Sequence, residues 1–330
     1  MILEIENKNK TFLDAEKTVD KKKKHKNFSY SKWGYLFLIP FFMAFLLFTF
    51  LPLISTFYYS FFEFYSDGLK EVGPNFVKFE NYKQVIVESQ FFKYLGNTII
   101  IWLLGFIPQI IISLLLAVLF TDTRLKLKFT GFFKSIIYMP NLVMASAFGM
   151  LFLTIFSTSG PIANILIRLN ITKHFDYSTS IWMTRGLIAS MNLLMWFGNT
   201  TILLMAGVMG IDISLFEAAR IDGANSWKIF FKITMPLLRP IFLFVLLTSM
   251  IGGIQLFDIP QVFTRGMGNP NLTSKTVIMY LAQVLGASKN YGAAGAASVM
   301  LFFITVVLSL VLFVFTYKKD ISTKHKGRKA

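Results

Sequence analysis

The feature that most constrains this chain is a set of six apolar runs, each long enough to cross a lipid bilayer as a helix. A membrane-spanning helix needs about 20 mostly apolar residues, and no Asp, Glu, Lys or His lies well inside any of the six. Because short polar loops separate the runs, the sequence predicts an all-α fold, a polytopic membrane helical bundle with six transmembrane helices. The runs are Tyr35–Phe62, Thr98–Phe120, Phe132–Phe156, Gly186–Gly210, Leu237–Phe257 and Tyr291–Tyr317.

The composition agrees with a membrane protein and narrows its chemistry. Hydrophobic residues make up 55% of the 330 residues and charged residues only 15%, against about 25% in an ordinary soluble domain. That balance excludes a disordered chain and disfavours a soluble enzyme. Because the chain has no Cys, it can form no disulfide, thiolate metal site or thiol nucleophile. We expect no cofactor and no metal.

The net charge of +16 is a signal of topology. Of the 33 Lys and Arg, 23 lie in residues 1–34, in the loops near 121–134 and 211–240, and after residue 317. Cytoplasmic loops carry such an excess, so six spans place both termini in the cytoplasm. The segments 1–34 and 318–330 are then basic cytoplasmic tails, the first predicted to be disordered, around a six-helix transmembrane region at 35–317. Attraction to anionic lipid is a simpler secondary role for these charges than nucleic-acid binding.

The spans bear on the class of membrane protein. Proton-driven transporters usually place Asp, Glu or His inside the bilayer, whereas His25, His174 and His325 all lie outside the runs. An ion-coupled secondary transporter is therefore a weaker alternative. A membrane interaction subunit without a transport role is a second one.

The fourth run carries neutral polar side chains on one face. Asn192, Trp196 and Asn199 are spaced i, i+4 and i+7, and Gln255 lies near the end of the fifth run. Amides exchange hydrogen bonds with hydroxyl groups and an indole ring covers C–H faces, so this set suits an uncharged polyhydroxylated ligand. The competing interpretation is that these amides join helices to one another.

The loop at 211–236 has the most specific pattern in the chain. Ser214 with Glu217 forms a capping box that predicts a helix start, and Gly223 is placed to end that helix in a left-handed turn. Ser226 can cap a second, amphipathic helix, and Pro236 opens the fifth span. The apolar face of that second helix would comprise Trp227, Phe230, Phe231 and Thr234. Such a hairpin fits either a partner's groove or the lipid surface.

The same loop resembles the coupling loop of ABC importer permeases, whose signature is Glu-Ala-Ala, three residues, Gly, nine residues, Ile, one residue and Leu-Pro. Met235 replaces the usual Leu, a volume-conserving change. Phe257–Asp258, Thr264–Gly266 and Gly160–Asn164 extend the likeness, over about residues 33–320, to the first permease subunit of maltose, glycerol-phosphate and multiple-sugar importers. The loop positions that match are Glu217, Ala218, Ala219, Asp222, Gly223, Ala224, Ile233 and Pro236.

The resemblance implies a set of partners. Such a permease forms half of a heterodimeric pore with a second permease, in a prokaryotic plasma membrane. Two copies of a cytoplasmic ATPase sit beneath the pore, and an extracytoplasmic binding protein delivers a carbohydrate. The coupling-loop residues would contact the ATPase, and Asn192, Trp196, Asn199 and Gln255 are candidates for the substrate path. Another solute, such as glycerol phosphate, is the alternative.

The chain has no Walker A loop, so ATP hydrolysis is expected on a partner and the chain itself is expected to be non-catalytic.

Overall fold

The computed structural model describes residues 31–68, 70–125 and 128–326. Its packing divides the chain into two units, Met1–Ser55 and Thr56–Ala330. The predicted tail at 1–34 lies almost wholly outside the described residues, and the tail at 318–330 begins inside a helix that continues to Lys326. Each unit is described by itself.

The described part of the first unit is helical. It contains α2 (Ser31–Phe45), the π-helical turn η1 (Leu46–Phe50) and the start of α3 (Leu51–Tyr59), which continues into the second unit. Side chains from residue 34 to residue 55 are exposed within this unit, although most are apolar. An apolar helix without a protein partner of its own needs lipid or another chain around it.

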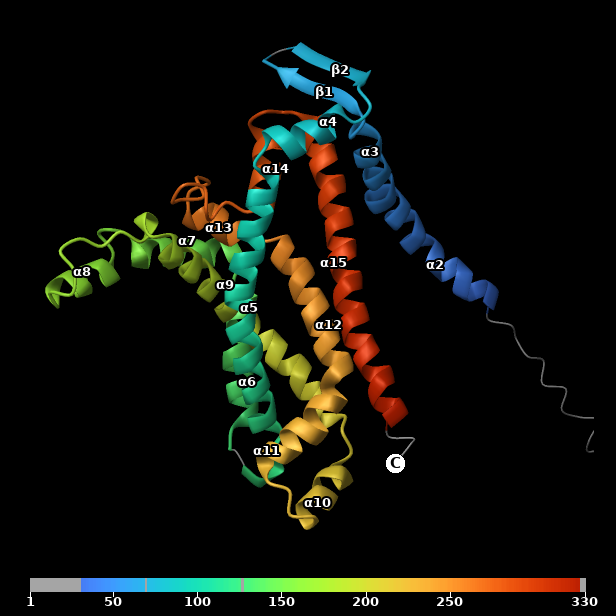
Figure 1. The fold of residues 1–330 in the computed structure, drawn as a ribbon, viewed down its shortest axis with the longest axis vertical. Helices are drawn as coiled ribbons and strands as arrows, with labels where there is room; N and C mark the ends of the chain where they lie inside the picture. Colours follow the sequence, from blue (N-terminus) through green and yellow to red (C-terminus); the bar gives the residue numbers. More distant parts are fainter. Residues whose placement is uncertain (1–30, 69, 126–127, 327–330) are drawn as a thin grey trace, which may run out of the picture. The chain divides into compact units, whose positions relative to one another are not determined.

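Four long helices build the second unit. Figure 1 shows α5 (Phe91–Thr121), α12 (Met235–Ile254) and α15 (Tyr291–Lys326) running along the bundle, while α9 (Ile181–Met209) packs along α5. Small residues allow these helices to approach closely. A Cβ at Gly105 would lie 2.9 Å from the backbone oxygen of Ala189, and one at Gly253 would lie 2.1 Å from the Trp102 ring. The buried core forms two main clusters, one where α5 and α12 meet α15 and one where α5 and α9 meet the segment that follows α12.

Shorter elements lie between the long helices along the chain, and some of them belong to the candidate membrane spans. They are β1 (Phe62–Asp67), β2 (Lys70–Phe76), α4 (Glu80–Lys83), η2 (Gln84–Glu88), η3 (Thr123–Leu125), α6 (Thr130–Tyr138), η4 (Met139–Leu142), α7 (Ala145–Phe156), α8 (Pro161–Arg168), η5 (Tyr177–Thr179), α10 (Ile213–Ile221), α11 (Ser226–Ile229), η6 (Phe230–Thr234), α13 (Asp258–Phe263) and α14 (Val277–Gly286).

The two strands form an antiparallel hairpin at one end of the bundle, outside the spans (Figure 1). Phe62 pairs with Phe76 and Asp67 with Lys70, with a register shift between Glu63 and Tyr65. Gly292, at the start of α15, lies against this hairpin, because a Cβ there would meet the Phe62 oxygen at 2.2 Å. The membrane bundle is all-α as predicted, and the hairpin is an extramembrane addition to it.

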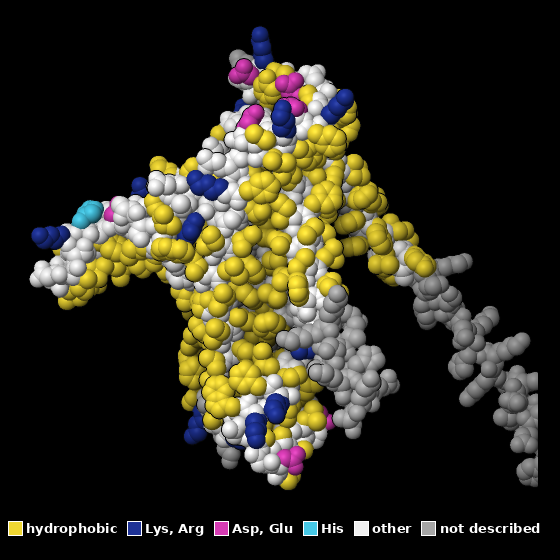
Figure 2. Space-filling view, in the orientation of Figure 1, with side chains coloured by type: hydrophobic (Ala, Val, Ile, Leu, Met, Phe, Trp, Pro, Cys, Tyr) yellow, Lys and Arg dark blue, Asp and Glu magenta, His cyan; other side chains and the backbone are white. Residues whose placement is uncertain are grey.

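The prediction of six spans is confirmed in number, because the described residues contain six helices long and apolar enough to cross a membrane. These helices are Gly34–Tyr59, Phe91–Thr121, Ala145–Arg168, Ile181–Met209, Ser226–Phe263 and Tyr291–Thr316. Figure 2 shows hydrophobic side chains covering the middle of the visible face over α5, α12 and α15, with Lys and Arg near the α10–α11 end. A lipid-facing surface has this pattern.

The predicted span boundaries are shifted. The first helix ends at Tyr59 because Phe62 begins β1. The second and fourth helices begin earlier than predicted, at Phe91 and Ile181.

The third and fifth spans differ most from the prediction. Phe132–Phe156 is not one helix, because the 3-10 turn η4 at Pro140 and extended backbone at Val143–Met144 interrupt it. Proline lacks a backbone donor and disfavours helical backbone before it, which explains the break. The fifth span begins at Ser226 and not at Leu237, because the helix runs on through Pro236 and Pro240.

Candidate functional site

The helix that carries the Glu-Ala-Ala motif is α10, and its cap differs from the predicted one. Asp212 is the N-cap residue, and its Oδ1 accepts a hydrogen bond from the Ser214 backbone N–H at 2.9 Å. The predicted capping box of Ser214 and Glu217 is therefore wrong in register, since Asp212 already supplies the acceptor two residues earlier. That hydrogen bond holds the pKa of the exposed Asp212 carboxyl below its ordinary value. Glu217 is left free of a capping role.

The turn after α10 depends on Gly223, as predicted. Gly223 has φ of +75°, a left-handed conformation that disfavours other residues. The Ala224 N–H donates to the Ala219 oxygen at 2.9 Å and the Gly223 N–H to the Arg220 oxygen at 3.0 Å. These two bonds form a Schellman motif, which satisfies the last carbonyl groups of the helix. A Cβ at Gly223 would meet no atom within 4 Å, so only the backbone angle restricts this position.

The second helix of the loop buries only part of the predicted apolar face. Its cap is Asn225, whose Oδ1 accepts from the Lys228 N–H at 2.8 Å, in place of Ser226. Ile229 and Thr234 are buried, whereas Trp227 and Phe231 are exposed and stack on each other with ring centroids 5.9 Å apart. The π-helical turn η6 changes the helical period inside this segment, which explains why Thr234 turns inward with Ile229 while Trp227 and Phe231 stay exposed.

The motif residues of the loop gather on an exposed surface. Glu217, Ala218, Asp222 and Gly223 are exposed, and Ala219, Ala224 and Ile233 are half-buried, while Pro236 is exposed in the first turn of α12. Apolar side chains share this surface, with Ile221 87% exposed and Trp227 69% exposed. A small helical hairpin that exposes large apolar groups is suited to a groove on another protein or to lipid.

Three of the four predicted substrate-path residues line one cleft in the bundle. Asn192, Trp196 and Asn199 come from α9 and face α5 and α12 across a cleft of about 160 Å³. Asn192 and Asn199 are half-buried, and Trp196 is 46% exposed. In the part of the chain that the structure describes, neither Asn side chain has a hydrogen-bond partner. Gln255 is the C-cap residue of α12 and is exposed, but it does not line this cleft.

The rest of the cleft lining is also neutral. Its further polar residues are Gln109, Thr200, Thr248 and Ser249. The Gln109 Nε2 donates to Thr200 Oγ1 at 2.8 Å, and the Trp102 Nε1 donates to Ser249 Oγ at 3.1 Å. These bonds fix one wall, and the two α9 amides remain available. Amide and hydroxyl groups beside an exposed indole can bind hydroxyl-rich, uncharged molecules.

A buried polar network near the other end of α9 was missed by the sequence analysis. The Arg185 guanidinium is buried, and it donates to Asn97 Oδ1 at 2.8 Å and to the Thr273 oxygen at 3.0 Å. Asn97 in turn donates to the Leu272 and Lys275 oxygens. Arg185 escaped notice because the predicted span began at Gly186. Its position one residue before an apolar run was the signal in the sequence that could have indicated a buried cation at the end of the span.

Comparison with known proteins decides the family. The family model of binding-protein-dependent transport system inner membrane components matches residues 109–318, a range that includes both the cleft on α9 and the α10–α11 loop. The chain belongs to this family. It is a multi-pass membrane permease, and the resemblance to ABC importer permeases is confirmed.

Individual relatives agree with this assignment. The permease is 32% identical over 287 residues to the arabinooligosaccharides transport system permease protein AraP of Bacillus subtilis, covering 84% of this chain and 86% of that protein. It is 29% identical to the lactose transport system permease protein LacF of Rhizobium radiobacter, covering 85% and 92%. The crystal structure of a bacterial ABC transporter that imports the acidic polysaccharide alginate has the same fold, with a TM-score of 0.71 at 19% identity, covering 89% and 98%.

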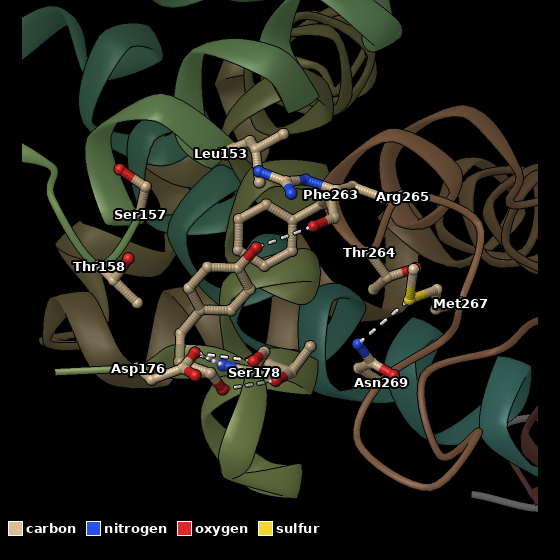
Figure 3. A pocket seen from close by; sticks show the side chains of 12 residues that line it. Leu153, Ser157, Thr158, Asp176, Ser178, Phe263, Thr264, Arg265, Met267 and Asn269 are labelled. Atoms are coloured by element: carbon tan, nitrogen blue, oxygen red, sulfur yellow. Dashed lines mark hydrogen bonds between the residues drawn. The ribbon is translucent and has the colours of Figure 1, made fainter.

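The permease has a second pocket, of about 230 Å³, between α7, η5 and the loop after α13 (Figure 3). Tyr177 stacks on Phe263 with centroids 4.5 Å apart, and its hydroxyl donates to the Phe263 oxygen at 3.0 Å. Burial raises the pKa of Tyr177, so the donor keeps its proton. Asp176 Oδ1 accepts from the backbone and hydroxyl of Ser178. These groups serve the local fold.

Proposed function

We propose that this permease forms half of the translocation pore of an ATP-driven importer. A second permease would complete the pore, and two copies of a separate cytoplasmic ATPase would drive it. An extracytoplasmic binding protein would deliver a neutral carbohydrate. In this assembly the permease lies in a prokaryotic plasma membrane with both termini in the cytoplasm, as the distribution of Lys and Arg favours.

The observation that carries the proposal is the exposed α10–α11 hairpin. Glu217 and Ala218 lie on its surface, the Schellman turn at Gly223 fixes its shape, and Ile221 and Trp227 expose apolar groups beside them. The small side chains of Ala218 and Ala219 leave room for a partner's backbone to approach. A rigid knob of this kind can carry a movement of the ATPase into α12, because the helical path from Ser226 into that span is continuous.

The neutral cleft supports an uncharged carbohydrate as the solute. Of the residues that line it, none is Lys, Arg, Asp or Glu, whereas a phosphate or carboxylate solute generally needs a countercharge. The names of the relatives, which refer to lactose and arabinooligosaccharides, point to the same class. Glycerol phosphate is therefore the weaker candidate for this chain.

In the mechanism that follows, the cleft is exposed to each side of the membrane in turn. ATP binding would close the ATPase pair and turn the α10–α11 hairpins, which opens the cleft outward to the binding protein. The unpartnered amides of Asn192 and Asn199 would then accept and donate hydrogen bonds to sugar hydroxyls, beside the Trp196 ring. Hydrolysis on the partner would reset the cleft inward.

The test is co-purification of the tagged chain from its own cells, comparing wild type with Gly223→Trp. A bulky residue is strained at φ of +75°, which costs about 1–3 kcal/mol and should distort the hairpin. Wild type is expected to bring down an ATPase and a second six-span protein, and the variant to lose the ATPase alone. Gly131→Trp is the matched control, because a Cβ at Gly131 also meets no atom within 4 Å.

Two results would overturn the proposal. If wild type comes down without any ATPase, the importer assignment fails and ion-coupled uptake becomes the next hypothesis. If the purified assembly, reconstituted in vesicles, takes up glycerol phosphate in preference to neutral oligosaccharides, the assignment of the solute fails while the ATPase coupling stands.

A further inference from the structure

A cavity of about 370 Å³ lies behind the α10–α11 hairpin, at the end of the bundle predicted to face the cytoplasm. Its walls come from the C-terminal ends of α5 and α9 and from α6, α10, α11 and η6. Val118 and Phe120 of α5 line it together with Ile229 and Phe230, so the wall is largely apolar. The volume lies in the range of pockets that hold small ligands, about 300–1,000 Å³.

Basic side chains outnumber acidic ones in the lining of this cavity. Arg124, Lys134 and Arg220 line it, and Asp122 is the single carboxylate among its lining residues. Asp122 is already engaged, because the Arg124 guanidinium forms an ion pair with it. The side-chain hydrogen bond from Arg124 holds the pKa of Asp122 below its ordinary value, and the charge of Arg220 acts in the same direction. Two positive charges, on Lys134 and Arg220, are left in excess.

These two cations have no acidic side chain of their own. In the described segments of the chain, neither Lys134 nor Arg220 forms an ion pair, and each lies next to apolar surface. The cavity is at the level where α5 and α9 end, which is the edge of the hydrocarbon region for helices that span it. An occupant from the membrane would therefore meet apolar wall and positive charge together.

We propose that this cavity binds the headgroup of an anionic phospholipid from the inner leaflet. The phosphate lies between Lys134 and Arg220, and the first carbons of the chains lie along the apolar wall. A free phosphate ion would leave that wall uncovered, and a neutral amphiphile would leave the two cations uncompensated. Because α10 forms one wall, the lipid also braces the hairpin. That consequence rests on the proposed function, whereas the binding itself does not.

The experiment measures lipid retention by the full-length chain in the assembly it forms. The assembly is taken from vesicles of phosphatidylglycerol and phosphatidylcholine, and bound lipids are counted by native mass spectrometry. Each basic side chain near an anionic surface contributes about fivefold in affinity. The double variant Lys134→Gln with Arg220→Gln should therefore lose phosphatidylglycerol about 25-fold. The matched control is Lys228→Gln with Lys232→Gln, which removes the same charge from exposed sites outside the cavity.

A second variant tests the volume of the cavity separately from its positive charges. Val118→Phe fills the cavity from a half-buried position and leaves every charge in place, so it should also reduce phosphatidylglycerol retention. Equal retention by the double variant and its control would overturn the proposal. So would loss in Val118→Phe alone, because the cavity would then hold a neutral amphiphile. Displacement of the lipid by inorganic phosphate at equal concentration would show a soluble anion site instead.

Discussion

The loops at the two ends of the bundle are built on opposite plans. At one end, the loop between α13 and α14 is fastened inside the chain, since Asn97 donates to the Leu272 and Lys275 oxygens at 2.9 Å and 3.1 Å. Arg185 adds a bond to the Thr273 oxygen. At the other end, the α10–α11 hairpin turns Ile221 and Trp227 outward.

The two loops differ in which contacts fix their conformation and in whether they leave apolar side chains exposed for a partner. The α13–α14 loop draws its conformation from buried hydrogen bonds to two spans, so the chain alone determines it. The hairpin takes its conformation from local caps and one glycine turn, and it leaves Ile221 and Trp227 exposed within the described chain. The α13–α14 loop needs no further contact to keep its conformation, whereas the hairpin exposes apolar groups that the proposed partner would cover.

The largest effect is expected at Arg185. Arg185→Met keeps most of the side-chain length but leaves Asn97 Oδ1 and the Thr273 oxygen without their donor. Each buried acceptor left unsatisfied costs about 1–3 kcal/mol, which outweighs the relief of removing a buried charge. We expect a loss of about 2–4 kcal/mol in the free energy of unfolding. Thermal unfolding in detergent measures it.

Arg168→Met is the matched control for this change, because Arg168 is exposed on α8. It should leave the unfolding temperature unchanged. If Arg185→Met instead stabilises the permease, the guanidinium does not fasten the loop, and the contrast between the two ends is lost.

An intermediate effect is expected at Trp227, and it should fall on binding alone. Because Trp227 is 69% exposed and contacts Phe231, Trp227→Ser should change the free energy of unfolding by about 0.5 kcal/mol or less. An aromatic anchor at a protein interface contributes about 2 kcal/mol or more, so ATPase retention should fall at least tenfold. Titration of the solubilised permease with its ATPase measures this loss.

Leu169→Ser controls for the loss of an exposed apolar side chain, because Leu169 is 64% exposed beyond α8. It should retain the ATPase in full. Equal retention by Trp227→Ser would show that the stacked ring pair does not belong to the docking surface.

The sequence was sufficient wherever a pattern is local and long. The six spans follow from apolar length, and the Gly223 turn follows from a residue type that the left-handed conformation requires. The placement of Asn192, Trp196 and Asn199 on one cleft follows from helical spacing. The remaining polar wall of that cleft could not be predicted, because Gln109 and Ser249 are brought there by tertiary packing.

The errors have equally specific causes. The predicted apolar face of the second loop helix is divided between the interior and the surface because the π-helical turn at Phe230–Thr234 changes the helical period, and no residue type in the segment predicts such a turn. The cap of α10 was placed two residues late because Asp212 and Ser214 are both good N-cap residues. The role of Arg185 depends on Asn97 and Thr273, which lie 88 residues away on either side.

The smallest effect is expected at Asp212, and it concerns the hairpin alone. The carboxyl accepts from the Ser214 N–H, and this bond holds its pKa below the ordinary 3.8. A lowered pKa in the folded state means that the stabilisation is complete above about pH 5, declines as the pH falls through 3.8 and is gone below the lowered pKa. Asp212→Ala should therefore speed amide exchange in residues 213–221 at pH 7, and its difference from wild type should shrink as the pH falls through that window.

Asp212→Asn keeps an acceptor and should stay close to wild type at pH 7, without the same pH dependence. If Asp212→Ala exchanges as slowly as wild type at pH 7, the start of α10 is set by packing, and the hairpin is less dependent on its local caps than the contrast with the α13–α14 loop requires.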